Sequence, residues 1–320
     1  MLKKIMNQAR IKVQITPVDP LLIKSGQATV GGVNMAFVRT YRFGEEDQPY
    51  IPGSSLKGVI RSYAERICRS LRENPVPVCL PYVRPGQEQP GEGRQASCGH
   101  RFDQLKIKLA QQDIYRLSCP ACRLFGSLGF AGRFSVSDAY LNGGHQLEIR
   151  DGVAIDRITG GAVPGAKYDL EILSQGSFVT TLELRNFERW QLGLIALVLR
   201  DMEEAMIHIG SGKSRGLGRI QAKILDFEVS YYNREVSSLT GLGGLCSSSE
   251  CESYGFLPET SETREIETAL PAPDKDGLRR KYSITEIWKD AMSPAVDDLL
   301  AYIGKVDWPE QIEKCARGKI

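Results

Sequence analysis

The sequence lacks the features of membrane-spanning and secreted proteins. No apolar run approaches the ~20 residues that a helix needs to cross a bilayer. The first ten residues carry cations but no apolar core of ~7–15 residues, so a secretory signal is not expected. The composition, with 42% hydrophobic and 25% charged residues, is typical of a soluble globular protein. We therefore expect a cytoplasmic protein without a membrane partner.

Histidine and net charge are also scarce. The 320 residues include three histidines, and the formal net charge is +2. No HExxH or HxE pattern places a glutamate beside a histidine, which argues against a catalytic zinc site. The small net charge neither favours nor excludes nucleic acid, because the local distribution of cations decides that question.

A nucleotide-binding loop is absent, although residues 208–219 are rich in glycine. A P-loop needs a glycine that is separated by four residues from Gly-Lys-Ser. Here Gly212 begins Gly-Lys-Ser, and Ile207 holds the place of the first glycine. A helical pattern precedes the stretch and a strand pattern follows it, the reverse of a P-loop or a dinucleotide fingerprint. ATP and NAD are therefore not expected. The cations between the glycines still predict an anionic ligand, with an incidentally charged hairpin as the alternative.

The cysteines predict a metal site. Eight cysteines in a cytosolic chain do not indicate disulfides, and Cys119-Pro-Ala-Cys122 has the gap that lets two thiolates share one metal. Residues 75–118 lack the apolar periodicity to fold alone, so we prefer a structural zinc to a redox pair or unligated cysteines. Five candidate ligands compete for four places: Cys79, Cys98, His100, Cys119 and Cys122.

With insertions set aside, hydrophobic periodicity predicts the order strand, helix, strand, strand, helix, strand. This is the ferredoxin-like βαββαβ arrangement of an α+β fold. A serine is expected to cap the first helix, whose N-terminus should attract an anion. The predicted strands cover residues 11–15, 134–141, 168–173, 178–184 and 219–229, and the predicted helices cover residues 56–71 and 187–206.

The C-terminal part of the chain has a different pattern. Residues 237–277 are poor in apolar side chains, which predicts a linker or a weakly ordered arm. A helical pattern covers 284–292 and restarts after Ser293-Pro294. We therefore expect a body over 1–235, with an insertion at 75–133, and a linker plus helical extension over 236–320.

Three segments combine glycine or serine with cations: Gly53–Arg61, Asp156–Gly165 and Gly210–Arg219. Several separate anion sites favour a polyanion, and a ferredoxin-like sheet favours single-stranded RNA. The usual pair of stacking aromatics is not evident on any strand, which favours contact with the RNA backbone. The candidate RNA-binding residues are Ser54, Ser55, Lys57, Arg61, Arg157, Thr159, Gly210, Gly212, Lys213, Ser214, Arg215, Gly216 and Arg219.

Four motifs carry a family resemblance: Tyr50–Arg61, Cys119–Ser127, Ile155–Ala162 and Gly210–Arg219. In this order the chain resembles the RAMP superfamily, and within it the backbone subunits of type III CRISPR effector complexes. The resemblance implies a modified RRM-like core that grips guide RNA phosphates, a zinc knuckle, and a thumb-like hairpin at 150–170 that wedges into the guide–target duplex. It also implies guide RNA, complementary target RNA and other effector subunits as partners.

The resemblance also implies a cleavage position. In the family, the loop after the first strand usually ends in Gly-Gly-hydrophobic-Asp, and this Asp drives metal-dependent cleavage of target RNA. Here the segment ends in Asn34, which can neither hold Mg²⁺ or Mn²⁺ as a carboxylate does nor take a proton. We therefore expect RNA binding without cleavage at this position. The alternatives are an endoribonuclease that cuts target or precursor guide RNA, with Glu45, Glu46 and Asp47 as suspects, and a stand-alone protein that binds single-stranded RNA.

Overall fold

The computed structural model describes residues 3–25, 33–41, 44, 47–80, 97–104, 109–257, 259, 269–306, 308 and 312. Its strands are β1 (Asn7–Pro17), β2 (Arg39–Thr40), β3 (Gln48–Ile51), β4 (Gly126–Ser127), β5 (Phe130–Ala131), β6 (Phe134–Val136), β7 (Ala139–Leu141), β8 (Gln146–Ile155), β9 (Ala162–Gln175), β10 (Phe178–Arg185), β11 (Ile207–His208), β12 (Arg219–Tyr232), β13 (Asp274–Asp276) and β14 (Arg279–Ser283). Its helices are α1 (Gly53–Leu71), α2 (Cys98–Gln104), α3 (Gln111–Arg116), α4 (Pro120–Phe125), α5 (Arg189–Glu203), α6 (Leu242–Leu245), α7 (Ser248–Tyr254), α8 (Trp288–Lys305) and the 3-10 helix η1 (Lys213–Arg215).

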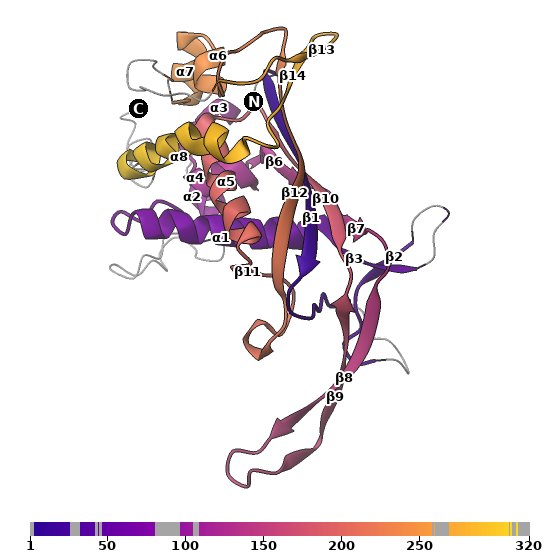
Figure 1. Ribbon diagram of the computed structural model, residues 1–320. Coiled ribbons are helices and arrows are strands. Elements are labelled where there is room, and N and C mark those ends of the chain that lie inside the picture. Colours follow the sequence, from indigo (N-terminus) through magenta and orange to yellow (C-terminus); the bar gives the residue numbers. More distant parts are fainter. Residues whose placement is uncertain are drawn as a thin grey trace.

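Strand β1 lies inside the main sheet and pairs antiparallel with β10 on one side and with β12 on the other (Figure 1). Through the described residues the strand order is β13-β14-β12-β1-β10-β7-β3-β2, with β6 also paired to β10 and β11 to β12. Ala9, Ile11, Val13 and Ile15 are buried and alternate with partly or fully exposed residues, as expected for a strand with one face on the core. The α+β class predicted from the sequence is confirmed.

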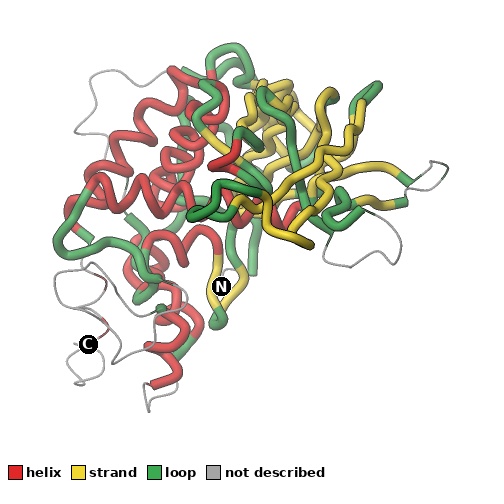
Figure 2. The backbone as a smooth tube through the Cα atoms, turned by 90° about the horizontal axis from the view of Figure 1, so that it is seen from below, coloured by secondary structure: helices red, strands yellow, loops and turns green. Residues whose placement is uncertain are grey.

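The helices gather on one face of this sheet (Figure 2). In α1 the residues Leu56, Ile60, Ala64 and Cys68 are buried at intervals of four, which gives the helix one apolar stripe. Helix α5 packs tightly against α8, because a Cβ on Gly193 would meet the main-chain oxygen of Ala295 at 2.1 Å. None of the helices in the described ranges has the length and apolar character needed to span a membrane.

The second core strand is broken where the sequence predicted one continuous strand over 134–141. Strands β6 and β7 both pair with β10, but Ser137 and Asp138 separate them. The break lets the Asp138 carboxylate accept a hydrogen bond of 2.7 Å from the N–H of Gly53, the first residue of α1. The N-cap is Pro52 and not a serine, so the predicted serine cap is wrong. A protein carboxylate thus takes one N–H at the helix end where we expected an anionic ligand.

The insertion contains short helices, although its sequence shows no helical period. Helices α2 and α3 precede α4, and the buried Tyr115 of α3 anchors this part to the body. Its hydroxyl donates to the Glu188 carboxylate at 2.5 Å and accepts from the Gln191 amide at 3.1 Å and from the Arg133 guanidinium at 3.1 Å. Specific tertiary contacts therefore order these helices more than their own periodicity does.

The C-terminal segments pack onto the body. Residues 239–257, predicted to be a linker, form α6 and α7 and bury Leu242 and Phe256. Strand β14 extends the main sheet by pairing with β12. The predicted helix break at Pro294 is also wrong, because α8 continues through it. Packing of α8 on α5 outweighs the hydrogen bond that the proline removes.

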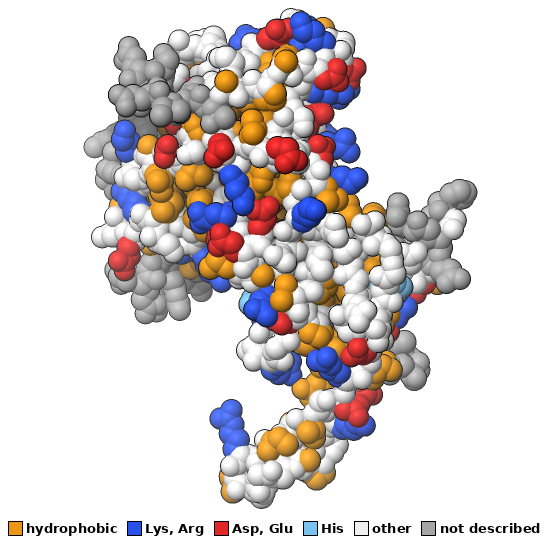
Figure 3. All heavy atoms as spheres, viewed as in Figure 1, with side chains coloured by type: hydrophobic (Ala, Val, Ile, Leu, Met, Phe, Trp, Pro, Cys, Tyr) orange, Lys and Arg blue, Asp and Glu red, His pale blue; other side chains and the backbone are white. Residues whose placement is uncertain are grey.

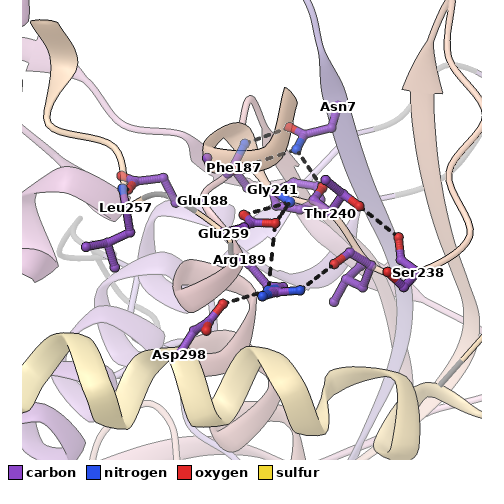
Figure 4. A network of polar contacts seen from close by, with 12 residues as sticks. Asn7, Phe187, Glu188, Arg189, Ser238, Thr240, Gly241, Leu257, Glu259 and Asp298 are labelled. Carbon is purple, nitrogen blue, oxygen red and sulfur yellow. Dashed lines mark hydrogen bonds and ion pairs between the residues drawn. The ribbon is translucent and has the colours of Figure 1, made fainter. Parts of the chain in front are cut away.

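A polar network fastens this C-terminal part to the start of α5 (Figure 4). The guanidinium of Arg189 is buried and lies 2.6 Å from the Asp298 carboxylate of α8 and 3.8 Å from that of Glu259. It also donates to the main-chain oxygen of Leu239 at 3.2 Å. The carboxylate of Glu259 accepts two hydrogen bonds, of 3.0 and 3.1 Å, from the N–H of Gly241. Burial raises the pKa of Glu259 to about 7 from 4.5.

We predict that this carboxyl makes folding stability depend on pH. Because its pKa is raised in the folded state, its favourable contribution is present below about pH 4.5 and is lost as the pH rises through about 7, by about 3 kcal/mol in all. Glu259→Gln should remove this loss. Urea unfolding of both proteins at a series of pH values from 4.5 to 7.5 checks it, and equal pH slopes for the two proteins would contradict it.

Candidate metal centre and nucleic-acid interface

Four cysteine thiols meet between α1 and the insertion. The Sγ atoms of Cys79, Cys98, Cys119 and Cys122 lie within 4.8 Å of one another, and all four residues are buried. The Sγ of Cys79 is 3.6 Å from that of Cys119 and 3.6 Å from that of Cys122. A tetrahedral metal with thiolate bonds of about 2.3 Å requires sulfur–sulfur distances of about 3.8 Å. The thiols are therefore spaced to hold a single metal ion.

The local structure explains how two of these thiols approach each other. Cys119 is the N-cap of α4, and its Sγ accepts a hydrogen bond of 3.5 Å from the N–H of Cys122 one turn later. Hydrogen bonds from Cys119 and Cys122 lower the pKa of Cys79, whereas burial raises the pKa values of Cys98 and Cys119. A metal ion bound by these thiols would deprotonate all of them.

His100 does not join this cluster. Its Nδ1 lies 2.6 Å from the Oγ of Ser97, whose hydroxyl also accepts from the main-chain N–H of His100. In the described part of the chain, the group of potential metal ligands consists of the four cysteines alone. Of the five candidate ligands named from the sequence, the structure therefore brings together the four cysteines, while the ring of His100 is hydrogen-bonded to Ser97.

Arg61 of α1 contacts the cysteine cluster directly. Its Nη2 lies 3.5 Å from the Sγ of Cys122, its Nη1 donates to the main-chain oxygen of Gly126 at 3.1 Å, and its Nε donates to the Glu65 carboxylate at 2.9 Å. The sequence placed Arg61 among RNA-binding residues. In the structure its guanidinium instead faces the thiols, where it can offset the negative charge of a tetrathiolate site.

Three other cations, which we call the cation group, belong to α1 and the glycine-rich loop. Lys57 and Arg66 belong to α1, and Lys213 belongs to η1 in the loop. Burial lowers the pKa of Lys57, with the charge of Arg61 adding to the effect, and burial and the charge of Arg66 lower the pKa of Lys213. Such shifts identify cations that lack a compensating carboxylate, which an anionic ligand would supply.

The glycines of the loop have two different roles. Gly210 and Gly218 have φ of +76° and +90°, and a Cβ on either would lie 2.2 Å from a main-chain oxygen. The N–H groups of Ser211 and Gly218 donate to the main-chain oxygens of residues 22 and 20. These glycines are thus required by packing. Gly216 has φ of +76° and open space around it, so it leaves the surface of the loop accessible.

The loop also contacts the β8–β9 hairpin. The guanidinium of Arg215 donates to the hydroxyl of Tyr168 on β9 at 2.8 Å, so the loop and the hairpin share one surface. Arg219 is instead held by the carboxylate of Asp19, with both contacts between 3.1 and 3.2 Å. The remaining predicted RNA-binding residues with exposed side chains are Ser54, Ser55, Arg157, Thr159 and Ser214, while Gly212 is half-buried.

The hairpin carries exposed aliphatic side chains, which Figure 3 shows along its length. Its tip is shaped by Asp156, whose carboxylate accepts from the N–H groups of Ile158 and Thr159 at 2.7 and 3.0 Å. The side chain of Ile158 is 96% exposed. An aliphatic side chain this exposed is typical of a surface that meets a partner. The exposed aliphatic residues are Ile149, Val153, Ile155, Ile158 and Val163.

Asn34 lies beside the middle of this hairpin, where Asp169 of β9 pairs with Asp151 of β8. Its Oδ1 accepts a hydrogen bond of 3.1 Å from the N–H of Asp169 on β9. The neighbouring Met35 forms a bridge with Leu170, so the segment after β1 is fastened to the hairpin. The preceding Gly31-Gly32 lies outside the described residues. So do Glu45 and Glu46, two of the carboxylates considered for RNA cleavage.

The sequence analysis missed two contributors to this surface. It did not select Arg66 of α1, whose charge lowers the pKa of Lys213. It also missed Tyr168, whose hydroxyl fixes Arg215. Neither contact has a signal in the sequence, because each joins segments that are far apart in the chain.

The fold and these sites define an α+β protein with a four-cysteine metal-ligand cluster beside a surface group of cations. The model of the RAMP superfamily matches residues 14–221, and the chain belongs to this superfamily. Membership indicates a CRISPR-associated, RNA-binding role. No curated protein matches the chain.

We predict that Arg61 supports the metal and not the RNA. Arg61→Ala should weaken zinc binding by about 10- to 100-fold, since removing an outer-shell partner of a metal site typically has this effect. Competition with a chromophoric chelator measures the change. Arg66→Ala is the matched control, because this arginine is on the same helix but stacks on Tyr63. An equal loss of zinc affinity in both variants, or none in Arg61→Ala, would contradict the assignment.

Proposed function

We propose that this protein is a guide-RNA-binding backbone subunit of a type III CRISPR effector complex. The observation that carries the proposal is that α1 and the glycine-rich loop of a RAMP superfamily member supply Lys57, Arg66 and Lys213, and that Arg66 is close enough to Lys213 to lower its pKa. These side chains make no ion pair within 4 Å with a described carboxylate. Cations without counter-charges bind the phosphates of an RNA strand without regard to its sequence.

The topology supports a modified RRM-like core. In βαββαβ numbering, β1, β6/β7, β10 and β12 are the four strands, and α1 and α5 are the two helices. Their order in the sheet, β12-β1-β10-β7, is the one that a ferredoxin-like fold requires. The hairpin of β8 and β9 extends away from the sheet (Figure 1). Its exposed aliphatic side chains support a thumb that wedges into the guide–target duplex.

We further propose that the four cysteines bind one structural zinc ion. A set of four cysteine ligands without an open position is typical of structural zinc, and burial of all four leaves no access for a substrate. The site joins Cys79, which follows α1 in the chain, to the first residue of α2 and to the N-cap of α4. Metal binding would therefore fasten the insertion to the body and supply folding energy that its small core lacks.

The subunit is proposed to bind target RNA without cutting it at Asn34. The Asn34 side chain has a structural role, since it accepts from the N–H of Asp169 midway along β9. Cleavage by a nearby carboxylate, or a stand-alone role in binding single-stranded RNA, are the alternatives that the experiments below separate. Mg²⁺ or Mn²⁺ would be needed only by a cleaving subunit.

We predict that Lys57→Ala and Lys213→Ala each weaken RNA binding equally for unrelated sequences. Each should reduce the slope of log K against log salt by about 0.7, the contribution of one contact to a single strand. Fluorescence anisotropy over a salt series measures both effects. Lys275→Ala is the control, because Lys275 on β13 pairs with Glu235, outside the cation group. A loss confined to one RNA sequence would argue against phosphate recognition.

A separate prediction concerns cleavage at Asn34. Complexes assembled with the natural subunit should not cut a guide-complementary RNA opposite this subunit in Mg²⁺ or Mn²⁺, whereas Asn34→Asp should bring a metal-binding carboxylate to the position. Gel mapping of end-labelled target RNA checks this. Cutting at that site by the natural complex, unchanged by Asn34→Ala, would show that another residue does the chemistry.

A further inference from the structure

Two tyrosines lie side by side on neighbouring strands of the main sheet. Tyr50 of β3 and Tyr140 of β7 are paired in register, and their rings stack with centroids 6.3 Å apart and planes 18° apart. Their neighbours Ile51 and Ala139 are completely buried. Because successive side chains in a strand point to opposite faces, the tyrosines lie on the sheet face away from the helices. The sequence analysis did not find this pair, since its members lie on strands that are far apart in the chain.

The same face has a hollow beside Tyr140. Its lining comes from the strands β12, β1, β10 and β7 and from the residue that follows β7. Its volume is about 300 Å³. This is at the small end of the range for ligand pockets. The lining combines aliphatic side chains and a tyrosine with one cation and one amide. Its lining residues are Lys12, Tyr140, Leu141, Asn142, Val179 and Leu225.

A β-bulge helps to form the hollow. The register between β1 and β12 shifts where Lys12 faces Asp226 and Val13 faces Ile224, so Leu225 is an extra residue on β12. Such a bulge redirects a side chain. Here Leu225 is 36% exposed, although its neighbour Ile224 is buried. The bulge therefore places an aliphatic side chain in the hollow, opposite the tyrosine.

The polar groups of the hollow are available to a ligand. The side-chain amide of Asn142 makes no hydrogen bond with another described residue, and Lys12 makes no ion pair within 4 Å with a described carboxylate. An amide offers both a donor and an acceptor to the edge of a base, and a lysine can reach a phosphate. Tyr140 offers an aromatic surface for stacking. This combination fits a nucleotide better than an apolar peptide side chain.

We propose that this hollow binds an unpaired nucleobase of single-stranded RNA, stacked against Tyr140. The proposal rests on the proposed RNA-binding function but concerns a second surface, on the opposite side of the sheet from Lys57 and Lys213. The cations of α1 and the loop hold phosphates, whereas the hollow recognises the base itself. Asn142 comes just before β8, so the site lies at the root of the hairpin (Figure 1).

The test separates bases from phosphates. Anisotropy is measured with a labelled oligouridine and with an abasic oligomer that has the same sugar–phosphate backbone. We expect the natural protein to bind the base-bearing RNA about tenfold more tightly, as one stacked base provides. Tyr140→Ala should bring this ratio close to one and leave abasic binding unchanged. Tyr140→Phe should keep the ratio, and so should the control Tyr41→Ala, whose side chain is 78% exposed outside the hollow.

The other outcomes are also decisive. Lys57→Ala with Lys213→Ala should weaken both oligomers equally and keep the ratio. A ratio unchanged in a Tyr140→Ala protein with natural thermal stability would overturn this proposal while leaving the proposed function intact. Failure of the natural protein to bind either oligomer would overturn both. Photocrosslinking with 4-thiouridine RNA should label residues 140–142, and labelling confined to α1 and the glycine-rich loop would contradict the proposal.

Discussion

The pairing of β1 with two partners at once is the constraint on which the rest of the structure depends. β10 and β12 flank β1 along most of its length, and they enclose the α5–β11 segment between them in sequence. The hairpin joins the sheet just before β10, and the glycine-rich loop joins it just before β12. Both therefore emerge at one end of the sheet, where Arg215 meets Tyr168. A shift of one residue would turn every buried side chain of β1 to the solvent, so this register is strongly specified.

Helix α1 divides its cations between two tasks. Arg61 turns inward to the thiols and Glu65, while Arg66 is exposed and close enough to Lys213 to lower its pKa. The four-cysteine cluster thereby sets the position of the helix whose outer face we propose to hold RNA. Metal site and cation group are connected through one helix, so a change at the thiols is expected to affect the RNA surface indirectly. This coupling gives an insertion with a small core a structural reason to carry four cysteines.

Periodicity was sufficient to predict the main elements from the sequence, because each pairs one apolar face with one core. Examples are the strand around residues 11–15 and the helix around 56–71. The cysteine cluster was predicted from the spacing of its cysteines. Contacts between distant segments were not predictable. The break at Asp138 depends on a helix end 85 positions away, and α8 continues through Pro294 because α5 supports it. His100 had suitable chemistry, but the adjacent Ser97 holds its ring. The Tyr50–Tyr140 pair exists only through strand register.

Residues 237–257 show why composition alone misled. Few apolar residues are present, but nearly the whole apolar surface of each is removed from water. The buried ones are Leu239, Leu242, Leu245 and Phe256. The buried Arg189, with Asp298, Glu259 and a main-chain oxygen as partners, fixes the same region through charge. Removing one partner from such a network costs far more than a surface ion pair would. A segment can therefore be ordered by a few well-placed contacts that no compositional average detects.

The central claim is that α1 and the glycine-rich loop grip a guide RNA within a larger assembly. The most direct test is to recover the tagged chain from its native cells and to sequence the RNA that accompanies it. Our account predicts RNA of discrete lengths derived from a CRISPR array, recovered with partner proteins and lost in the Lys57→Ala, Lys213→Ala double variant. Recovery of the chain without RNA, or with cellular transcripts in proportion to their abundance, would contradict it.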